Sequence, residues 1–482
     1  MVRDKCRALP LLVAGLVSGL GASCGNDADD VHGPSDSGSS DGTSSGESRD
    51  GGTCDGAIAV DAAPPVDAVL QGRIDDAVNS IRADSCFGQA DASACAWANY
   101  EVGPAWFNMA KSAGEAILII DSFGAGFFPE LVRYRNRLLG VYVTSGDEVE
   151  PQVLSVLLPQ RLGDVLVSFA GPEFVPASAL LQVALTADRA YGKLNLFYPG
   201  HGGVVFGHLV DLVPEQPLVL LDSTHLLDIP PEVCPGIDSR TLAAATAHFG
   251  AIAASMKRMM TDREVRFINA SFGLTAPVLA DQWQRSCSGA IPNGEELQQL
   301  LHVYDPLFDL LFNTEGVVTA HAAANLGDPA DFPFDQVGPQ YPNRVRVGFI
   351  SSSSSGLDEL GRGTVRKKEQ FPVDGDADVY LNWDCEVFEG CAEPHYTMAS
   401  AFGLAAGNVP IMSTSYIDPL ALARLVNLRY ANHGGEPMSN ALVRVLEREL
   451  APALCGPDGT EPCVYQDPIA HRQLEVYRLG YR

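Results

Sequence analysis

The chain has 482 residues, of which 46% are apolar and 19% are charged, so it can bury a large core and is not a disordered polyelectrolyte. Acidic residues outnumber basic ones by 60 to 32, which gives a formal net charge of −28. A surface this acidic repels phosphate groups, which argues against nucleic acid and against an anionic membrane surface as partners. Attachment to a membrane would therefore have to be covalent or through an apolar segment.

Residues 1–23 are typical of a secretory signal peptide. Residues 3–7 carry three cations, residues 8–20 are apolar almost throughout, and small residues precede Cys24. The apolar run is too short to remain in a bilayer as a spanning helix. The position of Cys24 resembles the lipid-attachment box of bacterial lipoproteins, which implies that Cys24 is lipidated and becomes the new N-terminus. An ordinary signal peptide with an incidental Cys24 is the alternative.

Residues 24–55 have the composition of a tether. They are rich in Gly, Ser and Asp and offer almost no side chain that a core could bury, so this stretch is expected to be an extended, self-repelling linker. Together with Cys24, the linker predicts a lipoprotein of the bacterial cell envelope, held to the membrane by a lipid anchor. A secreted protein is the alternative location.

Export also accounts for the 11 cysteines. Apart from Cys6 in the signal peptide and Cys24, nine remain, and those that are close in sequence are expected to form local disulfides. The predicted pairs, of which the last rests on the weakest pattern, are Cys86–Cys95, Cys385–Cys391, Cys455–Cys463 and Cys234–Cys287. Cys54 would then be the odd thiol. No CxxC or HExxH pattern is present, so no zinc site is predicted.

The remaining chain divides into an N-terminal extension over 56–100 and one large domain over 101–482. The extension has a helical pattern at 66–83, followed by a Cys-bounded loop. Apolar runs in the large domain predict buried strands at Ala116–Ile120, Leu218–Leu221, Val265–Ile268, Gly316–Ala320 and Val345–Ile350, and helices at Ser239–Met260 and Leu297–Phe312. This alternation predicts an α/β fold with a mostly parallel sheet covered by helices on both faces. Ligands of such sheets bind beyond the carboxyl ends of the strands.

Five segments place polar side chains at such strand ends. Asp121 ends the first strong strand, His201 lies between glycines before an apolar helical run, and Ser271-Phe272-Gly273 forms a bend after a strand. Asn325 lies in a loop after a strand, where its amide could donate to a developing oxyanion. Residues 395–407 place a hydroxyl at the start of a small-residue helix, where unpaired amides stabilise negative charge. Each segment alone also has an ordinary structural explanation, such as a turn or a helix cap.

In this order, the five segments resemble the subtilisin family of serine peptidases. The family's pattern is a strand-end Asp-Ser/Thr-Gly, then His-Gly-Thr-x-Val-x-Gly, Asn-x-Ser-x-Gly, Ala-Ala-Gly-Asn and finally Gly-Thr-Ser-Met-Ala-x-Pro. The matching residues are Asp121, His201, Ser271-Phe272-Gly273, Asn325 and Met398-Ala399-Ser400. The order of Asp, His and nucleophile is that of subtilisin-type triads. The resemblance covers roughly residues 100 to 430 and implies a three-layer, subtilisin-like α/β fold.

The family's nucleophilic serine aligns with Thr397. A threonine keeps a hydroxyl that His201 can deprotonate, but its γ-methyl group restricts χ1 and crowds the path of an attacked carbonyl. His395 also adds a side chain where the family has a glycine that lets the backbone pass close to a substrate. These departures predict weak catalysis. Ser400, about one turn further along the presumed helix, is the alternative nucleophile.

The resemblance implies a serine-type endopeptidase that hydrolyses peptide bonds by acyl transfer. Thr397 would attack, His201 would serve as general base and then acid, Asp121 would orient the imidazole, and Asn325 would bind the oxyanion. Ser271-Phe272-Gly273 would pair with the backbone of a peptide or protein substrate.

A second interpretation is a catalytically inactive, peptidase-like lipoprotein that binds extended peptides without cutting them; a purely structural lipoprotein is a third. No cofactor and no metal site are predicted, although the family resemblance leaves structural calcium open. The sequence does not indicate an oligomeric state.

Overall fold

A computed structural model describes residues 67–89, 92–107, 115–124, 127–170, 177–191, 194, 200–213, 216–323, 341–350, 365–366, 377–382, 414–454 and 464–466. The predicted signal peptide, Cys24 and the linker lie outside these residues. So do the predicted site residues Asn325, Thr397 and Ser400, and the predicted pairs Cys385–Cys391 and Cys455–Cys463.

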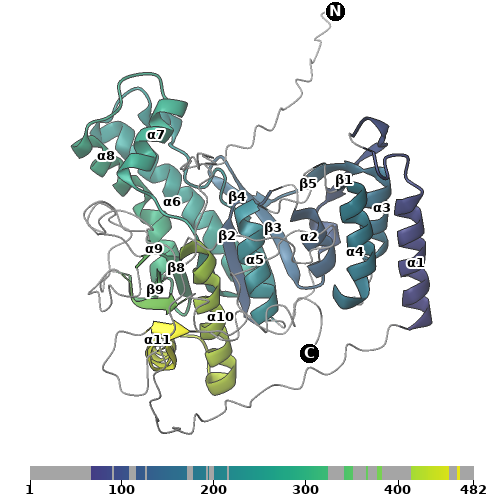
Figure 1. Ribbon diagram of the computed structural model, residues 1–482. Coiled ribbons are helices and arrows are strands. Elements are labelled where there is room, and N and C mark those ends of the chain that lie inside the picture. Colours follow the sequence, from purple (N-terminus) through teal and green to yellow (C-terminus); the bar gives the residue numbers. More distant parts are fainter. Residues whose placement is uncertain are drawn as a thin grey trace, which may run out of the picture. The chain divides into compact units, whose positions relative to one another are not determined.

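A mixed sheet of ten strands forms the centre of the described structure (Figure 1). In spatial order its strands are β12 (Val464–Gln466), β11 (Val379–Asn382), β9 (Arg344–Ile350), β8 (Val318–Ala322), β7 (Val265–Ala270), β2 (Ala116–Asp121), β6 (Leu218–Asp222), β3 (Leu138–Ser145) and β4 (Glu148–Pro151), while β10 (Val365–Arg366) pairs with β9. The antiparallel pair is β3–β4, and the other pairs of this sheet are parallel. The predicted α/β class with a mostly parallel sheet is therefore confirmed.

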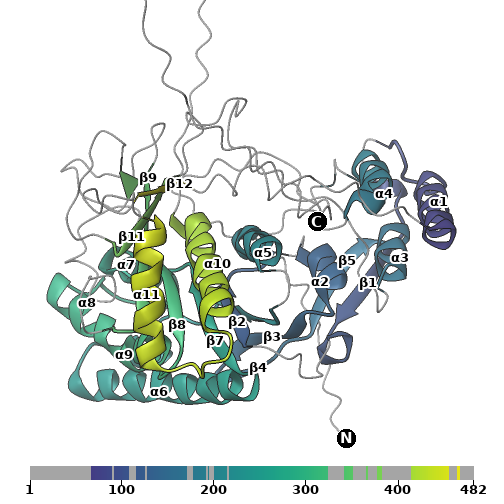
Figure 2. The same ribbon diagram turned by 90° about the horizontal axis from the view of Figure 1, so that it is seen from below.

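The strands form because their apolar runs bury both faces of the sheet. In β2, Ile117 and Ile119 point into one core, and Leu118 and Ile120 point into the other. The first core is covered by α5 (Gly200–Leu212), α10 (Thr414–His433) and α11 (Asn440–Leu454). The second is covered by α6 (Ser239–Asp262), α8 (Gly294–Leu301) and α9 (Asp305–Asn313). Figure 2 shows α5 and α10 on the side of the sheet opposite to α6.

The chain order creates a switch point beside β2. After β2, the chain forms β3 and β6 on one side of it, then passes to the other side for β7, β8, β9 and β11. In open α/β sheets, ligands bind at the carboxyl ends of the strands where the strand order reverses in this way. Asp121 is the last residue of β2, so the topology places it at this point.

All five predicted strands are present, but one predicted helix is divided. The stretch Leu297–Phe312 consists of α8, a 3₁₀ turn over His302–Tyr304 and α9. Pro306 lies in the first turn of α9, where its missing N–H costs nothing, so it begins a second helix instead of continuing the first.

The interval between Asp121 and His201, which the sequence pattern did not explain, packs with the N-terminal extension. Helix α1 (Ala68–Arg82) packs on α3 (Gln160–Ser168) and α4 (Ala177–Tyr191), and α2 (Phe128–Tyr134) contacts α3. Strand β1 (Trp97–Val102) pairs antiparallel with β5 (Leu154–Pro159). The extension therefore builds one unit with residues from the large domain.

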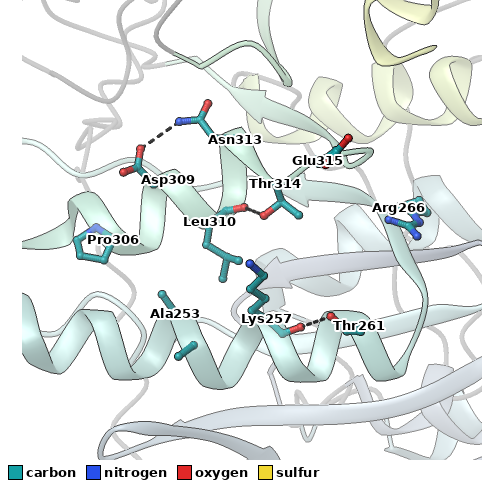
Figure 3. A pocket seen from close by; sticks show the side chains of 11 residues that line it. Ala253, Lys257, Thr261, Arg266, Pro306, Asp309, Leu310, Asn313, Thr314 and Glu315 are labelled. Atoms are coloured by element: carbon teal, nitrogen blue, oxygen red, sulfur yellow. Dashed lines mark hydrogen bonds between the residues drawn. The ribbon is translucent and has the colours of Figure 1, made fainter. Parts of the chain in front are cut away.

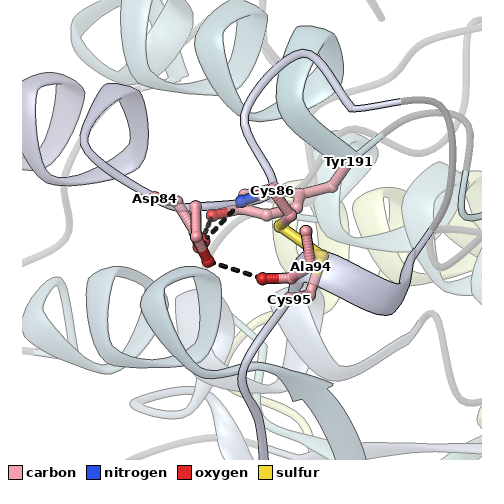
Figure 4. Close-up of a disulfide and its surroundings, with 6 residues drawn as sticks. Asp84, Cys86, Ala94, Cys95 and Tyr191 are labelled. Carbon is pink, nitrogen blue, oxygen red and sulfur yellow. Dashed lines mark hydrogen bonds between the residues drawn. A yellow bond between two sulfur atoms is a disulfide. The ribbon is translucent and has the colours of Figure 1, made fainter.

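Two of the predicted disulfides are present. Cys86–Cys95 closes the loop after α1 (Figure 4). Beside it, the Tyr191 hydroxyl donates to Asp84 Oδ2 at 2.7 Å and the Cys86 N–H donates to Asp84 Oδ1 at 3.1 Å, so one carboxylate joins this loop to the end of α4.

The second disulfide, Cys234–Cys287, joins the segment before α6 to the end of α7 (Ala276–Ser286). Within the described ranges, no helix combines the length and the apolar character needed to cross a bilayer.

Candidate active site

Asp121 is buried at the carboxyl end of β2, with 4% of its surface exposed. The Ser122 N–H donates to its Oδ1 at 2.7 Å, and its own carbonyl accepts from the Ser223 N–H at 2.9 Å. The first bond orients the carboxylate on the backbone directly after β2, and the second joins the backbone of Asp121 to the residue after β6.

His201 is the second residue of α5, and its ring faces this carboxylate. Its Nδ1 lies 2.7 Å from Asp121 Oδ1 and 2.9 Å from Oδ2. A carboxylate only accepts hydrogen bonds, so Nδ1 carries the hydrogen and the neutral imidazole keeps its lone pair on Nε2. The imidazole is thereby held in the tautomer that a general base needs.

The electrostatics of the pair favour a protonatable imidazole. Burial lowers the pKa of His201, but attraction to Asp121 and the hydrogen bond between them outweigh this effect and raise that pKa above its ordinary value. Burial raises the pKa of Asp121, and the charge and hydrogen bond of His201 act in the opposite direction. The pair is therefore built to stabilise an imidazolium beside a buried carboxylate.

Two glycines explain how α5 comes so close to β2. Gly202 donates its N–H to the Ser122 carbonyl at 2.8 Å, and a Cβ at this position would lie 2.9 Å from the Asp121 Cβ. Gly200 has φ +75°, and a Cβ there would lie 2.4 Å from the Gly124 nitrogen. The glycines on either side of His201 thus permit a close approach that other residues would block.

The N-terminus of α10 reaches the same point. The ring of Tyr416 lies 4.9 Å from that of His201, at an interplanar angle of 33°. Ser415, the residue before it, is buried, and the Thr414 hydroxyl donates to the Ala323 carbonyl at 2.6 Å, at the end of β8. Ser415 therefore lies in the first turn of a helix that contacts His201 through the next residue, Tyr416.

Pro419 shapes this first turn. A proline has no N–H, so the carbonyl four residues earlier, that of Ser415, receives no helical hydrogen bond. The Ser271 hydroxyl donates to that carbonyl instead, at 3.2 Å. The bend after β7 is therefore hydrogen-bonded to the backbone of Ser415.

The predicted Ser271-Phe272-Gly273 segment lies at the end of β7, with three different environments. The Ser271 side chain is buried, the Phe272 carbonyl lies 2.9 Å from His321 Nε2, and Gly273 is exposed, with no atom within 4 Å of where its Cβ would be. Gly273 is thus the part of this segment that leaves its backbone accessible.

Of the predicted catalytic residues, the structure brings Asp121 and His201 together, and Asn325 and Thr397 lie outside the described residues. Sequence reasoning missed Ser415. The signal was present, because Pro419 follows Ser415 by four residues, as Pro follows Ser in Gly-Thr-Ser-Met-Ala-x-Pro. The Met398-Ala399 match drew attention to Thr397 instead.

A groove of about 560 Å³ lies elsewhere, between α6 and α9 (Figure 3). It is lined by Lys257 and Arg266 and by Asp309 and Glu315, so neither sign of charge prevails. Arg266 is near the start of β7, at the end opposite to the Asp121–His201 pair. Among the described residues, no three His, Cys, Asp or Glu side chains are grouped so that they could hold a metal ion.

Comparison of this chain with protein-family models, curated proteins and solved structures finds no match.

Proposed function

We propose that this protein is a subtilisin-like serine endopeptidase, with a triad of Asp121, His201 and Ser415. The observation that carries the proposal is the hydrogen-bonded Asp121–His201 pair with Ser415 at the start of the adjacent helix α10. The three residues come from separate elements at the carboxyl edge of the sheet, which supports the roles of nucleophile, base and orienting acid. We assign the nucleophile to Ser415 in place of Thr397 and Ser400.

In this mechanism, the Ser415 hydroxyl attacks the carbonyl carbon of a peptide bond while His201 Nε2 takes its proton. Asp121 stabilises the imidazolium that forms, and His201 then gives the proton to the leaving amine. Water repeats the sequence on the acyl-enzyme and releases the second product. Because Ser415 has the same hydroxymethyl group as the family's nucleophile, the crowding expected for Thr397 does not arise.

The oxyanion would be bound by Asn325 and by backbone N–H groups of the first turn of α10. Asn325 lies outside the described residues, but it follows Ala323 by two residues, so covalent geometry keeps the two Cα atoms within about 8 Å. The Ala323 carbonyl in turn accepts a hydrogen bond from the hydroxyl of Thr414, the residue before Ser415. This connection supports Asn325 as an oxyanion donor.

An extended peptide substrate would add as a strand beside Ser271-Phe272-Gly273. The exposed backbone of Gly273, at the edge where Ser415 lies, supports this binding mode. We further propose that the chain is exported and anchored to the cell envelope through a lipid on Cys24. The disulfides Cys86–Cys95 and Cys234–Cys287 support export, since such bonds persist in oxidising compartments.

A fluorophosphonate probe tests the assignment, because it reacts only with an activated serine. We expect labelling of the full chain that is lost in Ser415→Ala and retained in Thr397→Ala and Ser400→Ala. Labelling that persists in Ser415→Ala would contradict this triad. If the wild-type chain is not labelled but binds extended peptides, the second interpretation, a peptidase-like binding protein, replaces the enzyme.

A further inference from the structure

A carboxyl group lies buried behind the candidate nucleophile. Asp418 is in the first turns of α10, between Ser415 and the end of β7, and none of its surface is exposed. Its Oδ2 lies 3.5 Å from the Ser271 Oγ, and its Oδ1 has no hydrogen-bond partner among the described residues. No step of the proposed acyl transfer uses this group, yet burying a carboxyl without full hydrogen bonding is costly.

The hydrogen bonds around Ser271 constrain the protonation of Asp418. Ser271 Oγ accepts from Asn269 Nδ2 at 2.7 Å, and its single hydrogen has two acceptors within reach: the Ser415 carbonyl at 3.2 Å and Asp418 Oδ2 at 3.5 Å. An ionised Asp418 competes for this hydrogen and draws it away from the Ser415 carbonyl. A protonated Asp418 brings its own hydrogen to Ser271 Oγ, and the Ser271 hydrogen stays on the Ser415 carbonyl.

The charges around Asp418 favour the protonated form. Burial, and then repulsion by Asp121 on β2, raise the pKa of Asp418 well above its usual range, although the Ser271 hydroxyl and the Ala270 N–H act in the opposite direction. On α5, His201 faces Asp121 and is paired with it. At the end of β7, Asn269, Ala270 and the following Ser271 do not titrate.

The described titratable side chains of β8 and β9 belong to the other face of the sheet. In β8 and β9, the side chains of His321 and Arg344 contact Phe312 of α9, on the face opposite to α10. Side chains alternate along a strand, so Arg346 lies on the same face as Arg344. Asp121 is therefore the charged neighbour that governs Asp418.

We propose that Asp418 is a neutral carboxylic acid that positions Ser415 through Ser271, and that its ionisation sets the alkaline limit of the site. The role in positioning rests on the proposed peptidase function, whereas the protonation itself does not. When Asp418 ionises, it takes the Ser271 hydrogen, and the first turn of α10 loses the bond that fixes the carbonyl of the nucleophile. Asp418 is thus a positioning residue, since it acts on the reaction through Ser271.

Thermal unfolding of the full chain as a function of pH tests the protonation. In the unfolded chain Asp418 releases its proton near pH 4, while the folded chain retains it, so folding loses stability as pH rises above that value. Asp418→Asn keeps the shape and a donor but cannot ionise. We expect its melting temperature, relative to that of the wild type, to increase by several degrees between about pH 4 and about pH 8.

Asp76→Asn is the matched control, because it removes the same charge from an exposed position of helix α1. Its difference from the wild type should stay nearly constant with pH. If Asp418→Asn does not fold, Asp418→Ser serves the same comparison. The protonation of Asp418 can also be measured directly, from the infrared band of a protonated carboxyl in the wild-type chain at neutral pH. A melting difference that does not change with pH, or a missing infrared band, would overturn the proposal.

Labelling with the fluorophosphonate probe tests the positioning. We expect the ratio of Asp418→Asn to wild-type labelling to rise with pH, and Ser271→Ala to lower labelling by roughly tenfold, as a displacement of about half an ångström would. A ratio that stays flat while the melting difference changes would refute the positioning and leave the protonation. Absence of labelling in the wild type counts against the proposed function, and the unfolding experiment still decides the state of Asp418.

Discussion

The closest approach in the candidate site is that of α5 to the end of β2, and Gly202→Ala tests whether the site depends on it. A Cβ added to Gly202 would lie 2.8 Å from the Ser122 carbonyl oxygen, 2.8 Å from the Phe123 ring and 2.9 Å from the Asp121 Cβ. Two of these three atoms belong to the backbone or stand next to it, so a flexible side chain cannot simply turn away. The helix has to move.

The size of the displacement follows from these distances. Ordinary contacts of a Cβ begin near 3.4 Å, so α5 must shift by roughly 0.5 to 1 Å, which stretches the bond between His201 Nδ1 and Asp121. A misplacement of about 1 Å in a catalytic group costs on the order of a hundredfold in rate, and such overpacking costs about 1–3 kcal/mol of stability. We therefore expect labelling of Ser415 to fall by roughly ten- to a hundredfold.

The measurement combines the labelling rate with the pKa of His201 determined by NMR, which does not depend on activity. Weakening the bond to Asp121 removes the interaction that raises this pKa, so the His201 pKa should fall in Gly202→Ala. Gly250→Ala is the matched control, because Gly250 is also helical, in α6, but a Cβ there meets no atom within 4 Å. This control should leave labelling unchanged and raise stability by up to about 1 kcal/mol.

The reasoning fails if Gly202→Ala labels Ser415 as fast as the wild type and keeps the same His201 pKa. Such a result would mean that α5 accommodates a methyl group without moving His201. The glycines on either side of His201 would then not be required for the approach.

A pH profile, one substitution and the removal of each disulfide test the electrostatics and the covalent frame. His201 must be neutral to act as a base, so wild-type labelling should rise with pH through a midpoint above the ordinary histidine value of about 6.5. Asp121→Asn should lower labelling by roughly 10⁴-fold and move the midpoint of the remaining activity to lower pH; a midpoint that moves upward would contradict the role of Asp121. Replacing Cys234 and Cys287 by serine should lower the free energy of unfolding, measured in denaturant, by about 4 kcal/mol. Replacing Cys86 and Cys95 by serine should lower it by about 2.5 kcal/mol. The difference is expected because the first disulfide closes a segment of 53 residues and the second a segment of 9 residues. Equal costs for the two pairs would argue against loop entropy as the cause.

The central strands could be predicted because they are buried on both faces, so burial alone determines which residues they contain. All six residues of β2 are buried, which explains why Ala116–Ile120 is a continuous apolar run. The first four residues of β6 are buried and apolar in the same way. Helix α6 begins at a capping box, in which Asp238 and Thr241 exchange hydrogen bonds. Local signals of this kind need no knowledge of distant partners.

The elements between Asp121 and His201 depend on distant partners and were not predicted. Strand β1 alternates exposed and half-buried residues, and it is stabilised by β5, whose pairing begins with Trp97 opposite Pro159. Strand β3 contains Gly140 with φ +156°, which interrupts its apolar pattern. Neither the pairing of β1 with β5 nor that of β3 with β6 can be read from local composition, because each partner is more than 50 residues away.

The same difference between local signals and distant partners explains why only part of the candidate site was predicted. Asp121 and His201 stand out because strand ends and paired glycines are local features. Ser415 stands out less, because Ser413 before it and Tyr416-Ile417 after it depart from the family pattern, although Thr414 and Pro419 match it. Its relation to His201 becomes apparent once α10 packs beside α5 on the same face of the sheet.

The arrangement of helices explains why the site lies at this edge. Both α5 and α10 begin where β2, β7 and β8 end, so the positive ends of two helix dipoles point to one place. These N-termini favour negative charge and therefore oppose an imidazolium at His201. The buried Asp121 supplies the compensating charge, and its hydrogen bonds to His201 outweigh the penalty. An oxyanion would be stabilised at this edge by the helix N-termini without an added cation. A second ionised carboxyl behind the site would instead be buried and repelled by Asp121, which is why the neutral state of Asp418 matters to the same site.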